Sequence, residues 1–305
     1  MKDLLTGILH SLPQKRPSLL FHGKARELPP KESYTPLAAS ARDRITVIDG
    51  GSAPILLTPG ACILFVRIVT LAMDSMLKKT IGKQEGFVAV TLDNQVIVRF
   101  LPLEGAAETL FTLPADEIVK EEQTLLAAGN LARRLLELRA AAAAEGLLVL
   151  DGSLEGKNPP ERSALERLRT RRLLALSKTT ATLSRGSFHA FFANAPGEQW
   201  YVPLETAPVW SGFARLAPAS RHVFRIDSFS DPSPLLEELA LWCEDPLLPG
   251  YPYPLVLVDQ LARVSEDERA ALRTRLAAAA GKEWSRIIED ESALDAHGIL
   301  DRMRF

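Results

Sequence analysis

The sequence predicts an α/β protein in which a mixed sheet is flanked by helices, with further strands and helices in its C-terminal part. Two apolar runs, residues 44–49 and 147–150, predict buried strands that each deliver an aspartate to their C-terminal edge, where glycine follows. Between them, residues 115–145 are rich in Ala, Leu, Glu and Arg and predict one long helix. Alternation of strand and helix signals along one chain is typical of α/β domains.

Composition limits the possible classes. The chain has 305 residues, of which 47% are hydrophobic and 24% charged, so it can bury a large core as one big domain or two modest ones. The two cysteines, Cys62 and Cys243, form neither a disulfide framework nor a metal-binding spacing, which fits a reducing cytoplasm. The longest apolar run, near residues 61–73, carries Arg67, and no signal peptide is apparent. We expect a soluble, cytoplasmic protein.

The formal net charge of −2 and the pI near 6.3 restrict the way in which this chain handles nucleic acid. A free-standing nucleic-acid binder is usually basic, because neutralising phosphates supplies most of its non-specific affinity. A nucleic-acid enzyme of this composition therefore needs a local positive patch or a second protein that delivers the substrate.

Residues 1–42 are expected to form an N-terminal helical arm and a linker, and residues 43–305 the main domain. The linker contains Pro29, Pro30 and Pro36, which exclude a regular ladder of hydrogen bonds. The main domain opens with strands that form a meander, predicted at residues 44–49, 61–70, 87–92 and 96–100, the last two joined by a turn at Asp93-Asn94.

The long helix carries one apolar stripe at helical spacing, which should lie against the sheet. Its members are Leu125, Ala128, Ala132, Leu135 and Leu136. The helix leads directly into the second strand-aspartate-glycine sequence. The predicted order is antiparallel strands, then a long helix, then a further strand that ends in an acid. This is the order of a ribonuclease H-like core.

The remainder of the chain continues to alternate. An arginine-rich stretch at residues 161–176, most simply the solvated face of a helix, runs into Leu176-Ser177-Lys178. Strands are predicted at residues 200–203, 212–216 and 222–227, and helices at residues 235–243, 250–264 and 266–280.

Asp49 and Asp151 are the first candidate site residues. Ligand sites lie outside the carboxyl ends of parallel strands, so two aspartates at such ends can converge on a metal. The alternative is an ordinary turn, because Asp bonds to its own backbone and Gly accepts positive φ.

Four motifs in order resemble the NurA nucleases, over roughly residues 44–265. They are VIDGGS at residues 47–52, LVLDGSL at residues 148–154, LSK at residues 176–178 and GYPYPL at residues 250–255. The resemblance implies a ribonuclease H-like fold, a divalent-metal site, degradation of DNA ends, a homodimer and partnership with the hexameric ATPase HerA. The role would lie in DNA repair or in defence against phage.

Carried over residue by residue, the resemblance implies that Asp49 and Asp151 bind metal. The third ligand would be Glu137, which precedes the second aspartate in the long helix. Helical periodicity by itself favours an earlier glutamate, because Glu137 lies off the apolar stripe, so Glu122 is the alternative. Oxygen ligands of this kind suit Mn²⁺ or Mg²⁺, most simply as two ions.

The resemblance also implies that Lys178 is catalytic, although Ala175 and Leu176 depart from the usual residues before it. Tyr251, in the GYP element, and Tyr253 would stack on DNA bases, and we expect Arg171 and Arg172 to contact DNA as well. Eight residues after Tyr251 the family often carries histidine, where this chain has Asp259.

Asp259 leaves two interpretations open, because an aspartate can ligate a hard cation or form a structural pair with Arg263. Two other functions also stay open. The chain could be a catalytically inactive partner of the ATPase, or an actin-like or sugar-kinase-type enzyme whose phosphate loop is residues 49–52.

Overall fold

The structure, a computed structural model, describes most of the chain. The described residues are 18–21, 24–27, 29–38, 43–114, 125–177, 183–185, 195, 197–220, 222–248 and 250–286. They divide into two compact units. The larger unit holds residues 43–150, 155–173 and those from Pro254 onward, and the smaller holds the described residues before Asp43 together with residues 151–154 and 174–253.

Six strands form the sheet of the larger unit. An antiparallel meander runs through β4 (Ile45–Leu57), β5 (Ala61–Met73), β6 (Lys79–Leu92), β7 (Gln95–Pro102) and β8 (Glu108–Pro114). On its other side β4 pairs in parallel with β9 (Leu147–Asp151). The predicted strands are confirmed here, including the turn at Asp93-Asn94, whereas β8 is an additional strand whose partly exposed side chains give a weak sequence signal.

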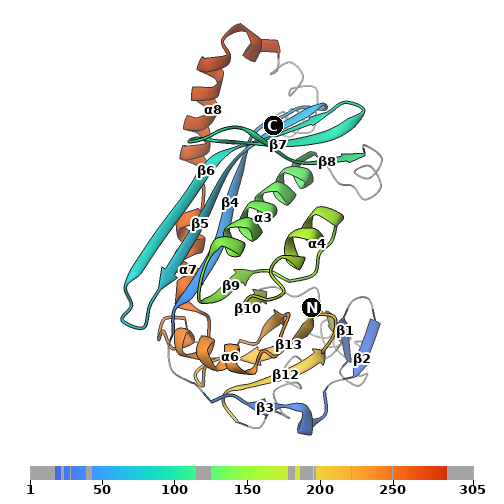
Figure 1. The fold of residues 1–305 in the computed structure, drawn as a ribbon, viewed down its shortest axis with the longest axis vertical. Coiled ribbons are helices and arrows are strands. Elements are labelled where there is room, and N and C mark those ends of the chain that lie inside the picture. The colour runs from blue at the N-terminus through green and yellow to red at the C-terminus, as the bar shows by residue number, and fades with distance from the viewer. Residues whose placement is uncertain are drawn as a thin grey trace, which may run out of the picture. The chain divides into compact units, whose positions relative to one another are not determined.

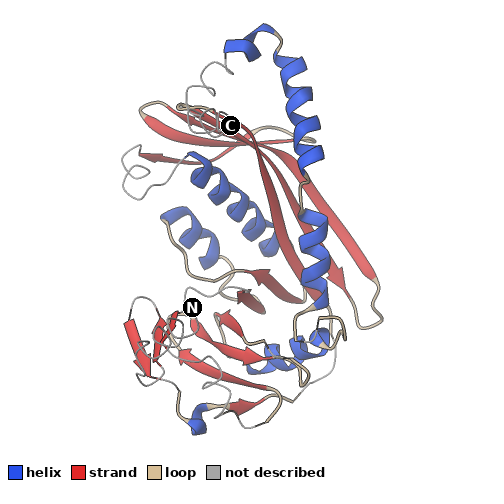
Figure 2. Cartoon of the chain, turned by 180° about the vertical axis from the view of Figure 1, so that it is seen from behind, coloured by secondary structure: helices blue, strands red, loops and turns tan. Residues whose placement is uncertain are grey.

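Helices cover both faces of this sheet. Gly50 faces α3 (Leu125–Ala143), because a β-carbon on Gly50 would lie 2.5 Å from Glu137 Oε1 and 3.1 Å from Arg133 Cγ. Gly51 faces the opposite helix, α7 (Tyr253–Ala262), since a β-carbon there would lie 2.7 Å from the carbonyl carbon of Ala262. Consecutive strand residues point to opposite faces, so α3 lies on one side (Figure 1) and α7 with α8 (Glu266–Ala280) on the other (Figure 2).

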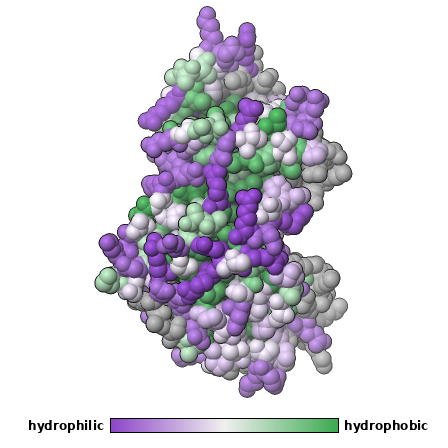
Figure 3. Space-filling view, viewed as in Figure 1, coloured by the Kyte–Doolittle hydropathy of each residue, from purple (hydrophilic) through white to green (hydrophobic). Residues whose placement is uncertain are grey.

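The helix α3 presents the expected stripe to the sheet. Leu125, Ala128, Ala132 and Leu136 are buried. Glu137 is buried as well, at 4% exposure, so the expectation that it lies off the buried face is wrong. The outward side is polar, and hydrophilic side chains cover much of this face of the molecule, with apolar patches between them (Figure 3).

The strand β4 differs from the prediction that it ends at Asp49. It continues for eight residues beyond Asp49, and Gly50 and Gly51 pair in register with Ile68 and Arg67. Both glycines have extended backbones and serve close packing rather than a turn. It is the parallel partner β9 that ends here, so Asp49 lies within β4, beside the carboxyl end of β9.

The arginine-rich stretch also differs from the prediction. A short helix, α4 (Pro159–Glu166), begins at Asn158, whose side chain accepts a hydrogen bond from the Glu161 amide. The chain then enters the strand β10 (Leu173–Ser177), all five residues of which are buried. A short apolar run that is buried on all sides has no helical or strand period, so periodicity cannot distinguish the two.

The smaller unit contains two sheets. In one, β3 (Thr35–Pro36), β12 (Trp200–Glu205), β13 (Trp210–Arg215), β14 (Phe224–Ser228) and β10 lie side by side. The other consists of β1 (Ser18–Phe21), β2 (Lys24–Glu27) and β11 (Leu183–Arg185). The helical turn η1 (Lys31–Ser33), the helix α6 (Ser233–Ala240) and the turn η2 (Leu241–Cys243) complete it, and the strands and helix predicted in this region are confirmed.

The two units divide residues 43–305 between them, and the described residues before Asp43 belong to the same unit as residues 174–253. The expected division into an N-terminal arm and one main domain stays a prediction. Among the helices that the structure describes, none is both long enough and apolar enough to cross a bilayer.

The contact of Gly51 with α7 generates the first prediction. In Gly51→Ala the new methyl group would overlap the Ala262 carbonyl, and the free energy of unfolding should fall by about 3 kcal/mol because backbone has to move. Urea unfolding of both proteins measures the change. The matched control is Gly82→Ala in β6, where the nearest atom would be Thr70 Cβ at 3.9 Å; equal stabilities of the two variants would contradict the packing described here.

Candidate metal centre

Three aspartates come together on the α7 side of the larger unit's sheet. One carboxylate oxygen from each of Asp49, Asp151 and Asp259 lies within 4.8 Å of the other two, and all three residues are half-buried. They are supplied by β4, by the end of β9 and by α7. Asp151 is the last residue of β9, whose preceding four residues belong to the larger unit.

Strand pairing accounts for the first two members. β4 and β9 are parallel, and Ile45–Ile48 pair in register with Leu147–Leu150, so Asp49 and Asp151 come next on neighbouring strands. Asp49 Oδ1 accepts a hydrogen bond from the Gly50 amide at 2.8 Å. Gly152 then turns the chain away with φ +104°, a conformation that residues with a β-carbon rarely adopt. The two aspartate-glycine sequences therefore differ in structure, because the first lies within a strand and the second begins a turn.

The third member depends on the packing of α7. Leu255, Val258 and Ala262 form the buried side of this helix, and Asp259 follows Val258 at the border of that side. One turn later, Arg263 Nη2 lies 3.4 Å from Asp259 Oδ2, with the Arg263 side chain 73% exposed. Asp259 thus forms the pair with Arg263 and also lies in the group of three carboxylates, and its role as a metal ligand stays a prediction.

Arg67 fixes the corner between α7 and α8. Its guanidinium forms ion pairs with Glu85 of β6 and Glu268 of α8, and Nη1 donates to the carbonyl oxygen of Arg263 at 2.9 Å. Burial acts to lower the pKa of Arg67, but the hydrogen bonds that Arg67 donates to Glu268 and Glu85, together with the negative charges of these carboxylates, outweigh it and raise the pKa above its ordinary value. In the sequence Arg67 is a single charge in a long apolar run. Such a charge indicates a buried side chain that is paired with other charged groups.

The chemistry of the group follows from its donors. Three carboxylates within 4.8 Å repel one another unless cations lie between them. Ligands that are all oxygen suit Mg²⁺ or Mn²⁺ rather than zinc. The exposed Arg263 offsets little of the negative charge, because pairs of this kind are screened by water.

Glu137, the expected third ligand, does not lie where a third ligand was expected. Its carboxylate lies against Gly50, on the face opposite to the α7 side, and forms ion pairs with Arg133 and, at 3.1 Å, with Arg134. Arg133 also donates to the carbonyl oxygen of Gly50 at 2.6 Å. The group of three described here does not include Glu137. Its role as a metal ligand remains a prediction, and the alternative, Glu122, lies outside the described residues.

The expected DNA-contacting residues lie at several places. Tyr251 packs its ring on Phe224, with centroids 5.5 Å apart, and Tyr253 is the half-buried first residue of α7. Arg171 donates to the carbonyl oxygen of Ala144, just after α3, and Arg172 lies 3.6 Å from the Asp43 carboxylate at an exposed position. Lys178 lies outside the described residues. Contact of these residues with DNA stays a prediction.

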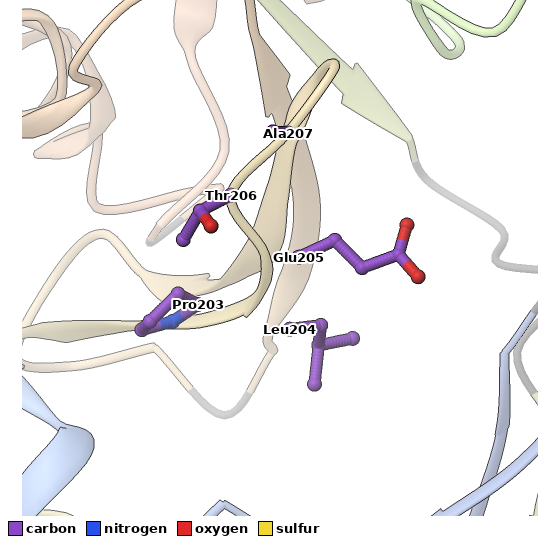
Figure 4. A pocket seen from close by; sticks show the side chains of 5 residues that line it. All are labelled: Pro203, Leu204, Glu205, Thr206 and Ala207. Atoms are coloured by element: carbon purple, nitrogen blue, oxygen red, sulfur yellow. The ribbon is translucent and has the colours of Figure 1, made fainter.

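A separate hollow lies at the turn after β12 (Figure 4). It is lined by residues 203–207, among which Glu205 is the single titratable group. The three aspartates take no part in it, and it offers no constellation of groups for catalysis.

Comparison with solved structures identifies the fold. The chain is similar to the crystal structure of the NurA nuclease from Sulfolobus solfataricus, with a TM-score of 0.53 and 14% identity over 92% of this chain and 95% of that chain. It also matches endonuclease V from Bacillus subtilis, with a TM-score of 0.37 and 11% identity over 82% of this chain and 90% of that one. No protein-family model and no curated protein sequence matched the chain.

The expected ribonuclease H-like α/β class is confirmed, and the resemblance indicated by the four motifs is confirmed at the level of the fold. The kinase alternative loses its main support, because residues 49–52 lie within a continuous strand rather than in a phosphate-binding loop.

The arginine pairs of Glu137 predict a structural effect. Glu137→Gln should lower the free energy of unfolding by about 3 kcal/mol, because it removes the charge that pairs with the partly buried Arg133 and Arg134, of which Arg134 keeps a longer pair with Glu161 at 3.6 Å. Glu108→Gln is the matched control, since Glu108 pairs with Arg139 at 2.6 Å with both side chains 44% exposed, and should change stability by less than about 0.5 kcal/mol.

Denaturant unfolding of both variants, together with Mn²⁺ titration, separates the two roles of Glu137. Unchanged stability combined with lost Mn²⁺ binding would contradict the structural account and mark Glu137 as a ligand.

Proposed function

We propose that this chain is a metal-dependent nuclease that hydrolyses DNA. The observation that carries the proposal is the convergence of Asp49, Asp151 and Asp259 within 4.8 Å, at the end of β9, in a fold shared with a NurA nuclease. A cluster of acids is common on protein surfaces, but this one lies at the carboxyl end of a parallel strand, where α/β proteins place their ligand sites.

In this function the three aspartates hold divalent cations, Mn²⁺ or Mg²⁺. Two such ions, when bound, activate a water and stabilise the leaving oxygen during in-line attack on a phosphodiester. Asp49 pairs with Val69 in the sheet, Asp151 directly follows the last paired residue of β9, and Asp259 lies on a packed helix, so the carboxylates would be oriented before substrate arrives. Lys178 would bind the non-bridging oxygens of the phosphate, where negative charge develops.

The wider assembly belongs to the same proposal. A chain with a net charge of −2 lacks the overall basic character that free-standing DNA enzymes use. Delivery of DNA by a HerA-type hexameric ATPase, to a homodimer of this chain in the cytoplasm, would remove that need, in DNA repair or in defence against phage. Tyr251, Tyr253, Arg171 and Arg172 are the residues we assign to DNA.

Cleavage of end-labelled linear DNA tests the proposal. Wild-type protein should degrade the DNA with Mn²⁺ or Mg²⁺ and not with EDTA. Asp49→Asn, Asp151→Asn and Asp259→Asn should each reduce the rate at least about 100-fold, because each removes one charged ligand. Gel analysis over a time course, with and without the cognate ATPase, gives the rates.

Asp93→Asn is the matched control, because Asp93 is an exposed aspartate at the turn between β6 and β7. It should retain the wild-type rate. Cleavage that survives all three site substitutions would refute the mechanism, and no cleavage by wild-type protein, even with the ATPase present, would favour the inactive-partner function.

A further inference from the structure

The loop that follows Asp151 is fixed by groups that lie outside the carboxylate group. Ser177 Oγ donates to the carbonyl oxygen of Gly152 at 2.8 Å, and the Gly152 amide donates to the carbonyl oxygen of Leu176 at 3.0 Å. Two residues later, the Leu154 amide donates to Asp227 Oδ2 at 3.1 Å. The backbone is therefore held on both sides of Ser153, directly after Asp151.

Asp227 is held in place by several hydrogen bonds. It is fully buried, and its oxygens accept hydrogen bonds from Ser211 Oγ at 2.7 Å and from Arg225 Nε and Nη2 at 3.0 and 3.2 Å, besides the Leu154 amide. The ring of Phe21 lies 4.8 Å from the Arg225 guanidinium carbon. A buried carboxylate whose oxygens are all engaged cannot move without leaving charges unpaired.

Ser177 is the single polar residue of β10, whose other members are Leu173, Leu174, Ala175 and Leu176. Its side chain is buried, with 8% exposure, and an alanine would fill the same place in the strand. The hydroxyl is what the site requires, since it reaches Gly152. That glycine has positive φ, and a β-carbon added to it would meet no atom of the described residues within 4 Å, so none of their side chains packs against the turn at this point.

We infer that Ser177 and Asp227 are positioning residues, which hold the turn after Asp151 so that its carboxylate is aimed at the bound cation. The inference rests on the proposed metal-dependent function. Groups that orient metal ligands from outside typically change metal affinity about 10- to 100-fold when they are removed. Neither residue touches the cation or the substrate in this role.

The test compares two buried serines of the same unit in the full chain. Ser177→Ala removes the bond to Gly152, and Ser220→Ala removes a buried hydroxyl that donates to the carbonyl oxygen of His222 at 3.1 Å and takes no part in the hydrogen bonds of Gly152 or Asp227 described above. Calorimetric titration with Mn²⁺ should give about tenfold weaker binding for Ser177→Ala and less than about twofold for Ser220→Ala. Ser177→Thr keeps the hydroxyl and should restore the affinity.

Unfolding measured in EDTA provides the structural readout, and both alanine variants should lose similar stability because each loses the hydrogen bonding of one buried hydroxyl. Asp227→Asn should weaken Mn²⁺ binding further; should this variant fail to fold, the serine pair decides. Equal Mn²⁺ affinities of Ser177→Ala and Ser220→Ala would overturn the inference.

The two proposals fail in different ways. Wild-type protein that binds Mn²⁺ and shows the serine difference, yet leaves DNA intact, refutes the nuclease and leaves the positioning role. Wild-type protein that cleaves DNA while Ser177→Ala binds Mn²⁺ normally refutes the positioning role alone. Wild-type protein that binds no Mn²⁺ refutes both.

Discussion

The parallel pairing of β4 with β9 is the constraint on which the site depends. Four residues on each strand are in register and fully buried, and a slip by one residue would turn every side chain to the other face. Burial of these apolar residues stabilises the register, and the register places Asp49 beside Asp151. Parallel strands need a crossover connection, and α3 provides it between β8 and β9. The long helix therefore covers the sheet and also belongs to the connection that makes the parallel pair of the site possible.

The alternation of side chains along β4 then separates two sets of charges. Asp49 and Gly51 face α7, whereas Gly50 faces α3, where Glu137 is balanced by Arg133 and Arg134. Arg133 and Arg134 therefore act on the α3 face. On the α7 face Arg263 pairs with Asp259 at a largely exposed position, where water weakens the interaction, and in the proposed function the three aspartates supply the negative charge that holds a cation.

Local patterns in the sequence were sufficient for β4, β9 and α8, because each has a clear apolar run or a capped amphipathic pattern. They were insufficient where tertiary packing decides. The strand β10 has no period because it is buried all round. Helical spacing predicts that Glu137 pairs with Arg133 and Arg134, but it does not predict that the carboxylate is buried with them. For the site, Asp49 and Asp151 could be predicted from the apolar runs before them, although only β9 ends at its aspartate. That Asp259 lies beside them, and that Ser177 and Asp227 hold the turn, follows only from how distant segments pack.

The charge of the site has a consequence for the number of ions. In the proposed function the three carboxylates would carry three negative charges, and the phosphodiester of a bound substrate would add a fourth. One divalent cation together with Lys178, which we assign to the phosphate, would leave one of these charges uncompensated, and a second cation would exceed the total by one. A neutral ligand at position 259 would leave only three negative charges and reduce the need for a second ion. In the proposed function the aspartate at this position therefore strengthens the case for a second ion, and it lies on α7, the element that Gly51 and Arg67 hold against the sheet.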